Sequence, residues 1–347
     1  MLMLDRRGIG GLLVGAGTVL AGVARAEAAG CGGYVFTADE GGRSISAVDL
    51  ATGRVASTRI TIAPHNVDAI SSRGLLLAAG AAGAEHGGSH GGQQADAAGR
   101  LILLEHVAGA GPRVVAEIAA GIHPAHVVPD PAGQRAFMSD SGTDTILVIE
   151  LDAGRIAGSI PVDKGPHGMR LSPDGTELWV ANTTAGSVSV IDITRMREAA
   201  RIRVGPRPVQ VGFLPDGSRL YVTLAGANQV AEIDRATRQV TRRVAVGPGP
   251  AQLFAAPDGR QVFVANQGTR ASPGTTVSVI DVARGTVART LSTGRGAHGV
   301  SICAGGSRAF ITNMYEDSLT EIDADRMEVL RRFAVGRAPN GVAWLPG

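Results

Sequence analysis

The stretch PDGTELWVAN, residues 173–182, combines a tight-turn signal with a run of strand-forming residues. Close copies follow at residues 215–224 (PDGSRLYVTL) and 257–266 (PDGRQVFVAN). In each copy the Asp-Gly pair supplies the left-handed backbone conformation of a tight hairpin turn. The aliphatic and aromatic residues that follow favour a β-strand. The stretch therefore predicts the turn and the second strand of a repeated β-sheet unit.

Looser copies of this unit fill the rest of the chain, and each copy has a third strand that ends in an acid. The seven acids are Asp49, Glu105, Glu150, Asp192, Asp234, Asp281 and Asp323. The steps between them are 56, 45, 42, 42, 47 and 42 residues. A period near 42 residues with four strand-like runs is typical of a propeller blade. The sequence predicts an all-β fold, a seven-bladed β-propeller of four-stranded antiparallel blades.

The unit around residues 173–182 defines the expected strands of a blade. We expect an inner strand at 168–171, a second strand at 178–181, a third at 188–191 and an outer strand at 200–204. The repeats begin on a second strand, at 34–38, and end on an inner strand, at 339–345. The last strand should therefore complete blade 1, so that the ring closes without an open sheet edge.

The composition suits one closed ring of short strands. Aromatic residues make up only 3% of the 347 residues, and 49 are glycine, so the core must be aliphatic. We expect a single propeller domain over residues 31–347 with a Gly/His-rich loop insertion at 81–99.

Residues 1–26 resemble an export signal, with Arg6 and Arg7 before a glycine-rich apolar stretch and an A-x-A sequence that ends at Ala26. The paired arginines fit a twin-arginine signal, and the ordinary secretory route is the alternative. Either signal predicts a periplasmic or secreted protein.

The charge balance excludes several classes of partner. The whole chain has a formal net charge of +2, and removal of the signal takes away three arginines and one aspartate, which leaves a neutral protein. A neutral surface offers no electrostatic footprint for nucleic acid and no basic patch for a membrane surface. Because no further run of 18 apolar residues exists, we expect no membrane span, and we expect a monomer.

Strand sequences such as Tyr221-Val222-Thr223 resemble those of the YVTN-type seven-bladed propeller family. The resemblance covers essentially residues 31–347. It implies the fold but says little about activity, because such rings serve as enzymes, metal carriers and surface proteins.

The two cysteines, Cys31 and Cys303, both align with the turn between a first and a second strand, in blades 1 and 7. Those blades are neighbours across the closure of the ring, and exported proteins meet an oxidising environment. We therefore predict a disulfide between them, and two unpaired thiols are the alternative.

Seven of the eight histidines fall on the face of the ring where the inner strands begin. They are His65, His86, His90, His123, His126, His167 and His298, and only His106 falls elsewhere. His86 and His90 lie in the glycine-rich insertion, whose composition predicts mobility and metal affinity. This concentration of histidine favours a functional site at one mouth of the central channel.

Imidazoles without a nearby thiolate or acidic cluster suit zinc or copper better than calcium or magnesium. His65, His126 and His167 come from consecutive blades and form the best three-ligand set. His86 or His90 could fold over them as a fourth ligand. His298 lies farther round the ring, and His123 is a ligand or a simple loop residue.

The insertion motif Glu85-His86 with His90, and the P-x-H-V sequence at 124–127, resemble those of periplasmic zinc-chaperone propellers. This resemblance implies a metal-binding propeller, with zinc ahead of copper, and a periplasmic solute-binding protein or other protein as partner. We therefore expect a metal-binding protein, and a metal carrier as its role.

Three other functions stay open. The first is an enzyme of the lactone-opening or lyase type, which needs a buried histidine paired with a carboxylate or an arginine at the mouth. The nearest candidates for that pairing are Arg207, Arg295, Arg337 and Asp140. The second is a redox propeller, although no C-x-x-C-H motif for covalent haem is present. The third is a scaffold that binds a protein through this face.

Overall fold

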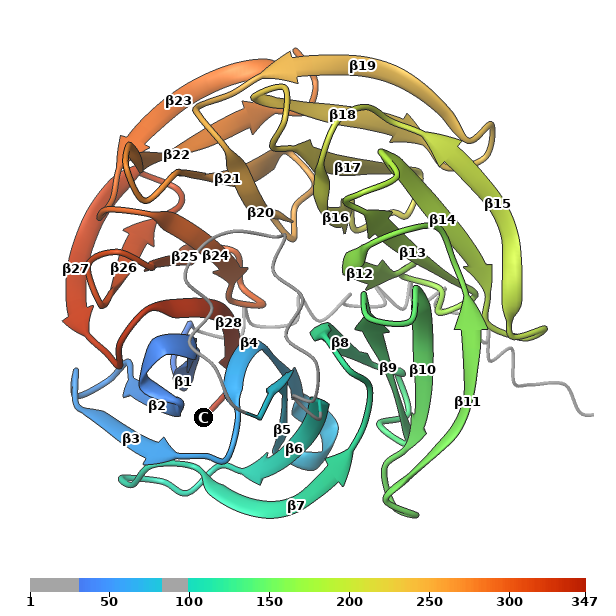
Figure 1. Ribbon diagram of the computed structural model, residues 1–347. Helices are drawn as coiled ribbons and strands as arrows, with labels where there is room; N and C mark the ends of the chain where they lie inside the picture. Colours follow the sequence, from blue (N-terminus) through green and yellow to red (C-terminus); the bar gives the residue numbers. More distant parts are fainter. Residues whose placement is uncertain (1–30, 83–98) are drawn as a thin grey trace, which may run out of the picture.

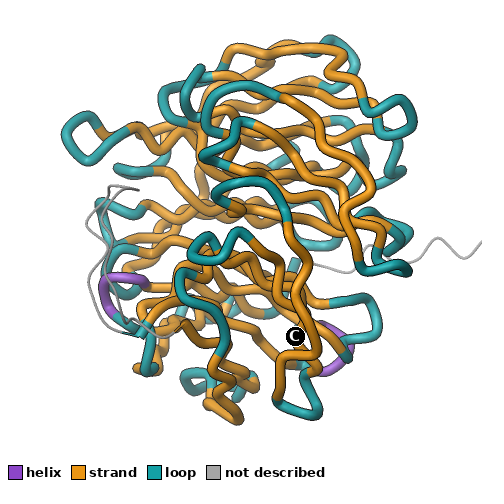
Figure 2. The backbone as a smooth tube through the Cα atoms, turned by 45° about the vertical axis from the view of Figure 1, so that its right-hand side comes forward, coloured by secondary structure: helices purple, strands orange, loops and turns teal. Residues whose placement is uncertain are grey.

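A computed structural model describes residues 31–82 and 99–347. Within these residues, 28 strands form seven four-stranded antiparallel sheets, arranged as blades around a common axis (Figure 1). Strands dominate the backbone, and two single-turn 3-10 helices, η1 (Glu40–Gly42) and η2 (Ser71–Arg73), interrupt it (Figure 2). The predicted all-β seven-bladed propeller is confirmed.

The strands of each blade run outward from the axis in the order inner, second, third and outer. Blade 1 consists of β28 (Pro339–Leu345), β1 (Tyr34–Asp39), β2 (Ser44–Asp49) and β3 (Val55–Arg59). Blade 2 consists of β4 (Ala63–Ile70), β5 (Leu75–Ala81), β6 (Gly99–Glu105) and β7 (Arg113–Ala119). Blade 3 consists of β8 (Pro124–Pro129), β9 (Arg135–Asp140), β10 (Thr145–Glu150) and β11 (Arg155–Pro161). Blade 4 consists of β12 (Pro166–Leu171), β13 (Glu177–Asn182), β14 (Ser187–Asp192) and β15 (Arg197–Arg203).

The remaining blades repeat this arrangement. Blade 5 consists of β16 (Pro208–Phe213), β17 (Arg219–Leu224), β18 (Gln229–Asp234) and β19 (Gln239–Ala245). Blade 6 consists of β20 (Pro250–Ala255), β21 (Gln261–Gly268), β22 (Pro273–Asp281) and β23 (Thr286–Ser292). Blade 7 consists of β24 (Ala297–Ile302), β25 (Arg308–Asn313), β26 (Ser318–Asp323) and β27 (Glu328–Ala334). Among the described residues, no helix has the length and apolar character needed to span a membrane.

The C-terminal strand closes the ring. β28 pairs antiparallel with β1, with Tyr34 opposite Leu345 and Phe36 opposite Ala343, and the two strands lie side by side in Figure 1. The innermost and the second strand of blade 1 therefore come from opposite ends of the chain, as predicted. This pairing satisfies the backbone groups that an edge strand would expose.

The core lies between neighbouring blades, because each sheet packs on the next one. Trp179 of β13 and Val190 of β14 are fully buried and share a cluster with Val211 and Leu220 of blade 5. Aliphatic side chains dominate these clusters, as the low aromatic content indicates. The interdigitated blades hold the inner strands at constant positions around the axis.

A disulfide joins Cys31 to Cys303, with their α-carbons 5.4 Å apart. Cys303 is fully buried and follows inner strand β24 of blade 7, whereas Cys31 precedes β1 of blade 1. The bond therefore connects the two blades that meet where the ring closes. It adds a covalent constraint beside the hydrogen-bonded constraint from β28.

Replacing both cysteines, Cys31→Ser with Cys303→Ser, should leave the fold intact but lower the free energy of unfolding by about 2–5 kcal/mol, because the unfolded chain gains freedom. Urea unfolding of the parent and the double variant under oxidising conditions measures this difference. The denatured, unreduced parent should contain no titratable thiol. Two free thiols, or equal stabilities, would contradict the structural role of the bond.

Several second strands end in a polar residue that binds the third strand of the same blade. In blade 4, Asn182 Nδ2 donates hydrogen bonds to two serine hydroxyls of β14, at 3.1 and 2.8 Å. In blade 1 the position belongs to Asp39, which accepts hydrogen bonds from the hydroxyls of Ser44 and Ser46 at 3.0 and 2.6 Å. Burial raises the pKa of the Asp39 carboxyl to about 6. At neutral pH the protein therefore carries a buried charge where blade 4 has a neutral amide.

The Asp39→Asn variant should be more stable than the parent at about pH 8 and should lose the parent's pH dependence between about pH 4 and 6. The folded parent holds this proton up to about pH 6, whereas the unfolded chain releases it near 3.8, so the free energy of unfolding falls as the pH rises through this window. The two pKa values differ by the equivalent of about 3 kcal/mol.

Urea unfolding of both proteins at several pH values tests this expectation. The matched control is Asn182→Asp, which should introduce the same loss of stability at high pH in blade 4. Parallel pH profiles of the free energy of unfolding for the parent and Asp39→Asn would show that folding does not change the pKa of the Asp39 carboxyl.

Candidate functional site

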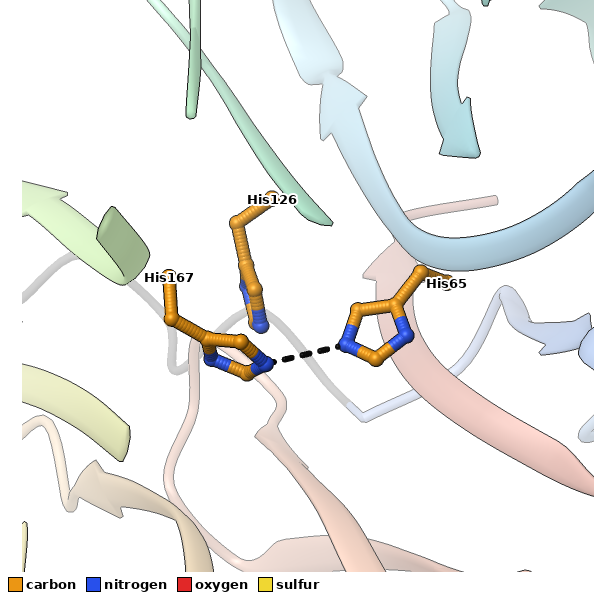
Figure 3. Close-up of side chains that lie close together, drawn as sticks. All are labelled: His65, His126 and His167. Carbon is orange, nitrogen blue, oxygen red and sulfur yellow. Dashed lines mark hydrogen bonds between the residues drawn. The ribbon is translucent and has the colours of Figure 1, made fainter. Parts of the chain in front are cut away.

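Three histidines from consecutive inner strands converge near the axis (Figure 3). His65 lies in β4, His126 in β8 and His167 in β12. One ring nitrogen of each lies within 4.8 Å of the corresponding atoms of the other two. The Nε2 atoms of His65 and His167 are only 3.1 Å apart. The three histidines that the sequence selected as one set therefore lie together in the fold.

Irregular strand pairing places each histidine. In blade 4, Pro166 pairs with Asn182 and Met169 pairs with Val180, so β12 contains one residue more than β13 between these pairs. His167 lies in this bulge. The pairing of β8 and of β4 shifts in the same way beside His126 and His65. A bulge turns side chains out of the regular alternation of a strand, and here it brings three imidazoles together.

The cluster is largely shielded from water. His126 is 2% exposed and His167 is 9% exposed, while the side chain of His65 is 17% exposed. Burial, followed by the proximity of His167 and His65, lowers the pKa of the His126 imidazole well below its usual range. His126 is therefore neutral at physiological pH. Its Nε2 is buried and has no hydrogen-bond partner among the described residues.

The opposite nitrogens of two rings are anchored. Nδ1 of His167 lies 3.0 Å from the carbonyl oxygen of Val209, in the neighbouring blade. A carbonyl can only accept a hydrogen bond, so Nδ1 carries the proton and the neutral ring presents a lone pair on Nε2. Nδ1 of His65 lies 3.4 Å from Glu40 Oε1 and 3.1 Å from Asn340 Nδ2.

Glu40 is a site residue that the sequence analysis missed, a single acid beside His65. Glu40 follows β1 in η1, is 5% exposed, and accepts a hydrogen bond from Asn340 Nδ2 at 2.8 Å. In the sequence, the feature that could have indicated Glu40 is its position directly after Asp39, the polar residue that ends the second strand of blade 1. The pair of Glu40 and His65 supplies the carboxylate and histidine that an enzyme of this type requires.

The other predicted histidines lie outside this group. The ring centre of His298 is 6.5 Å from that of His65, and its Nδ1 lies 3.3 Å from the carbonyl oxygen of Asn340. His123 precedes β8, and its backbone N–H donates to Asp140 at 2.8 Å. His106 packs against Tyr34 with ring centres 3.9 Å apart, away from the cluster as expected. His86 and His90 lie outside the described residues.

Two of the charged groups proposed from sequence as catalytic partners, Asp140 and Arg337, contact backbone groups. Asp140 accepts hydrogen bonds from the backbone N–H groups of Ile122 and His123. Arg337 binds the carbonyl oxygen of Gly41 through Nε at 2.7 Å. Neither contact pairs with a histidine side chain.

Carboxamides lie at the same level of several inner strands as the histidines. Asn66, Gln210, Gln252 and Asn340 are all buried in inner strands. Within the described part of the chain, Gln210 Oε1, Gln252 Nε2 and Asn340 Oδ1 have no hydrogen-bond partner. Buried polar atoms without partners are costly, and a polar ligand or water would satisfy them. The site thus combines buried imidazoles with uncharged hydrogen-bonding groups.

Gly168 is required beside His167 because blades 4 and 5 approach closely there. A β-carbon at this position would clash with Gln210 Oε1 and with the backbone carbonyl oxygen of Val209. That same carbonyl holds Nδ1 of His167. The glycine therefore allows the contact that orients the histidine.

Gly168→Ala should lower the free energy of unfolding by about 1–3 kcal/mol, because the backbone of blade 5 must move. The control is Gly158→Ala in β11, where a β-carbon meets no atom within 4 Å. Urea unfolding of both variants measures the contrast. Equal free energies of unfolding for Gly168→Ala and Gly158→Ala would show that blade 5 moves away from residue 168 at no cost in stability.

The fold and the cluster define a seven-bladed propeller with a polar, histidine-based site at the axis. The chain matches the model of the family "Lactonase, 7-bladed beta-propeller" over residues 32–302. This match covers well over half of the chain, and the protein belongs to that family. No curated protein sequence matches it.

Solved structures share the fold at low sequence identity. The periplasmic gluconolactonase PpgL of Pseudomonas aeruginosa has a TM-score of 0.70 and 18% identity, over 90% of this chain and 98% of that one. A putative 6-phosphogluconolactonase of Bacteroides uniformis has a TM-score of 0.71 and 13% identity, over 89% and 98%. Kuenenia stuttgartiensis hydrazine synthase has a TM-score of 0.70 and 19% identity, over 82% and 90%. At these identities the likeness shows the fold alone.

Family membership corrects the main functional prediction. We expected a metal-binding protein that carries zinc or copper, with a lactone-opening enzyme as an alternative. The lactonase family match supports the alternative, and the metal-carrier interpretation is wrong. The histidine concentration that suggested a carrier fits an enzyme equally well, because a buried carboxylate lies beside one of the imidazoles.

Proposed function

We propose that this protein is a hydrolase that opens lactones, and that the cluster of His65, His126 and His167 is its reactive centre. The match to the lactonase family carries the proposal. The geometry supports it, because a buried carboxylate lies beside the cluster of imidazoles. The proposed substrate is a cyclic ester of a polyhydroxy acid.

The reaction adds one water molecule to a cyclic ester. The water oxygen bonds to the carbonyl carbon and forms a tetrahedral intermediate, and the ring C–O bond then breaks. The ring oxygen leaves with a proton as a hydroxyl group, and the new carboxylic acid releases one proton to solvent. Because neutral water is a weak nucleophile, the site must activate it, and the imidazole cluster is the group suited to that task.

The surrounding groups support a polyhydroxylated substrate. The buried carboxamides of Gln210, Gln252 and Asn340 each have an oxygen or nitrogen atom without a partner in the part of the chain that the structure describes. Hydroxyl groups both donate and accept hydrogen bonds, so they can satisfy either kind of atom. We expect these carboxamides to orient the hydroxyl groups of the lactone.

We also infer that the protein is exported. The disulfide between Cys31 and Cys303 supports this inference, since such bonds persist in oxidising compartments. The proposed signal at 1–26 lies outside the described residues, so twin-arginine and ordinary secretion remain alternatives. The YVTN-type assignment within the propellers likewise rests on the strand sequences alone.

Purified protein should hydrolyse glucono-1,5-lactone faster than the spontaneous reaction, measured as proton release in a pH-stat. His126→Gln should lower kcat/KM by about 100-fold or more, because the cluster loses a buried imidazole. The matched control is His123→Gln, a histidine near the same strand that lies outside the cluster. It should keep the parent's activity.

Thermal unfolding of each variant separates loss of activity from loss of fold. Absence of hydrolysis by the parent on a panel of six-membered and five-membered sugar lactones would overturn the proposal. Full activity of a folded His126→Gln variant would remove the cluster from the reaction.

A further inference from the structure

Two imidazole nitrogens in the cluster approach more closely than two lone pairs can without something between them. The Nε2 atoms of His65 and His167 are 3.1 Å apart. A shared proton or a shared cation can hold two such atoms at this distance. In a tetrahedral zinc site, with zinc–nitrogen distances of 2.0–2.1 Å, two ligand nitrogens lie about 3.3 Å apart. The observed separation therefore fits two ligands of one ion.

The third imidazole favours the cation over the proton. One proton between His65 and His167 leaves Nε2 of His126 buried without a hydrogen-bond partner among the described residues. All three ligand atoms lie within 4.8 Å of one another, so small rotations about the side-chain bonds bring them around one point. An ion at that point satisfies all three nitrogens at once.

The outer nitrogens show the arrangement that supports metal ligands. Ligating histidines usually donate their second ring N–H to a carbonyl or a carboxylate, which fixes the ring and its tautomer. His167 has this contact with the carbonyl oxygen of Val209. Nδ1 of His65 lies 3.4 Å from Glu40 Oε1 and 3.1 Å from Asn340 Nδ2, which can only donate, so His65 would donate to Glu40 once Nε2 binds the ion and Nδ1 takes the ring proton. One ring thus has such an anchor in the structure, and a second has a carboxylate within reach.

We propose that His65, His126 and His167 bind one Zn²⁺ ion, which stays in the protein and leaves a fourth position open for water. Nitrogen-only ligands favour zinc over calcium or magnesium, and three histidines with an open position are a known form of catalytic zinc site. This ion is part of the reaction centre and is not a cargo.

The role of the ion in hydrolysis rests on the proposed lactonase function. A zinc ion held by the three histidines would lower the pKa of a bound water to about 7, so that this water would lose one proton to solvent near neutral pH. The hydroxide would add to the carbonyl carbon, the ring C–O bond would break, and the proton of the new carboxylic acid would pass to the ring oxygen. The products are one hydroxy-carboxylate and one released proton. Glu40 acts as a positioning residue through His65.

Zinc binding is tested with untagged full-length protein that has been stripped by a chelator and dialysed. Calorimetric titration with ZnCl₂ should show one ion per chain. The folded variants His65→Ala and His167→Ala should bind at least about 100-fold more weakly, and Glu40→Gln about 10–100-fold more weakly at unchanged thermal stability of the metal-free protein. Co²⁺ should give the intense visible bands of a tetrahedral site in the parent.

Two controls separate this site from other histidines. His123→Ala and the double variant His86→Ala with His90→Ala should bind Zn²⁺ as the parent does. Absence of binding by the parent, undiminished binding by the His65 and His167 variants, or loss of binding in the His86 and His90 variant would overturn the proposed site.

Lactone hydrolysis by the same stripped protein is a separate readout. Loss of activity on stripping and its return with Zn²⁺ would support the role of the ion. Undiminished hydrolysis without metal would overturn that role and leave the lactonase proposal intact. Zinc binding at the cluster in a protein that opens no lactone would overturn the lactonase proposal and leave the metal site.

Discussion

The pairing of β28 with β1 is the contact on which the arrangement of this protein depends. It joins the two ends of the chain in one blade and converts a linear series of repeats into a ring. Only in a closed ring do the seven inner strands surround one axis. Residues at equivalent positions of different blades then face each other, although they are tens of residues apart in the chain. The disulfide between Cys31 and Cys303 constrains the same junction.

The site is assembled at a β-bulge that the inner strands of all seven blades share. In blades 2, 3 and 4 the inner strand contains one residue more than its neighbour, and the histidine lies at or beside that residue. The bulge costs regular pairing but presents an imidazole at the axis. Gly168 is also needed, because the absence of a β-carbon lets blade 5 approach blade 4. The Val209 carbonyl oxygen of blade 5 can then accept a hydrogen bond from His167. The repeat thus builds both the frame and the bulges, and the histidines at the bulges of blades 2, 3 and 4 form the proposed reactive centre.

Burial gives the cluster its chemical character. Transfer of an imidazole from water favours the neutral form, and neutral rings present lone pairs for protons, water or metal ions. Buried carboxamide atoms of Gln210, Gln252 and Asn340 also have no hydrogen-bond partner within residues 31–82 and 99–347. A site of this kind suits a neutral, polar ligand more than a densely charged one, which agrees with a cyclic ester of a polyhydroxy acid as substrate.

Much of the architecture was predictable from the amino-acid sequence. The spacing of the Asp-Gly turns and the strand-ending acids predicts the blades, because turn chemistry and strand periodicity are local properties. The observed β13, Glu177–Asn182, differs from the predicted strand by one residue at each end. The set of His65, His126 and His167 was also predictable, because equivalent positions of neighbouring blades must be near each other in a ring.

Other features were decided by tertiary structure alone. Glu40 is an ordinary acid after a strand in the sequence, and only the fold buries it beside His65. The sequence left open whether His123 is a ligand or a loop residue, and the fold brings only His126 of the two into the group of three. The sequence by itself determined the ring, since turns and strands follow from neighbouring residues. The fold decided the composition and protonation of the site, because these depend on burial and on contacts between blades.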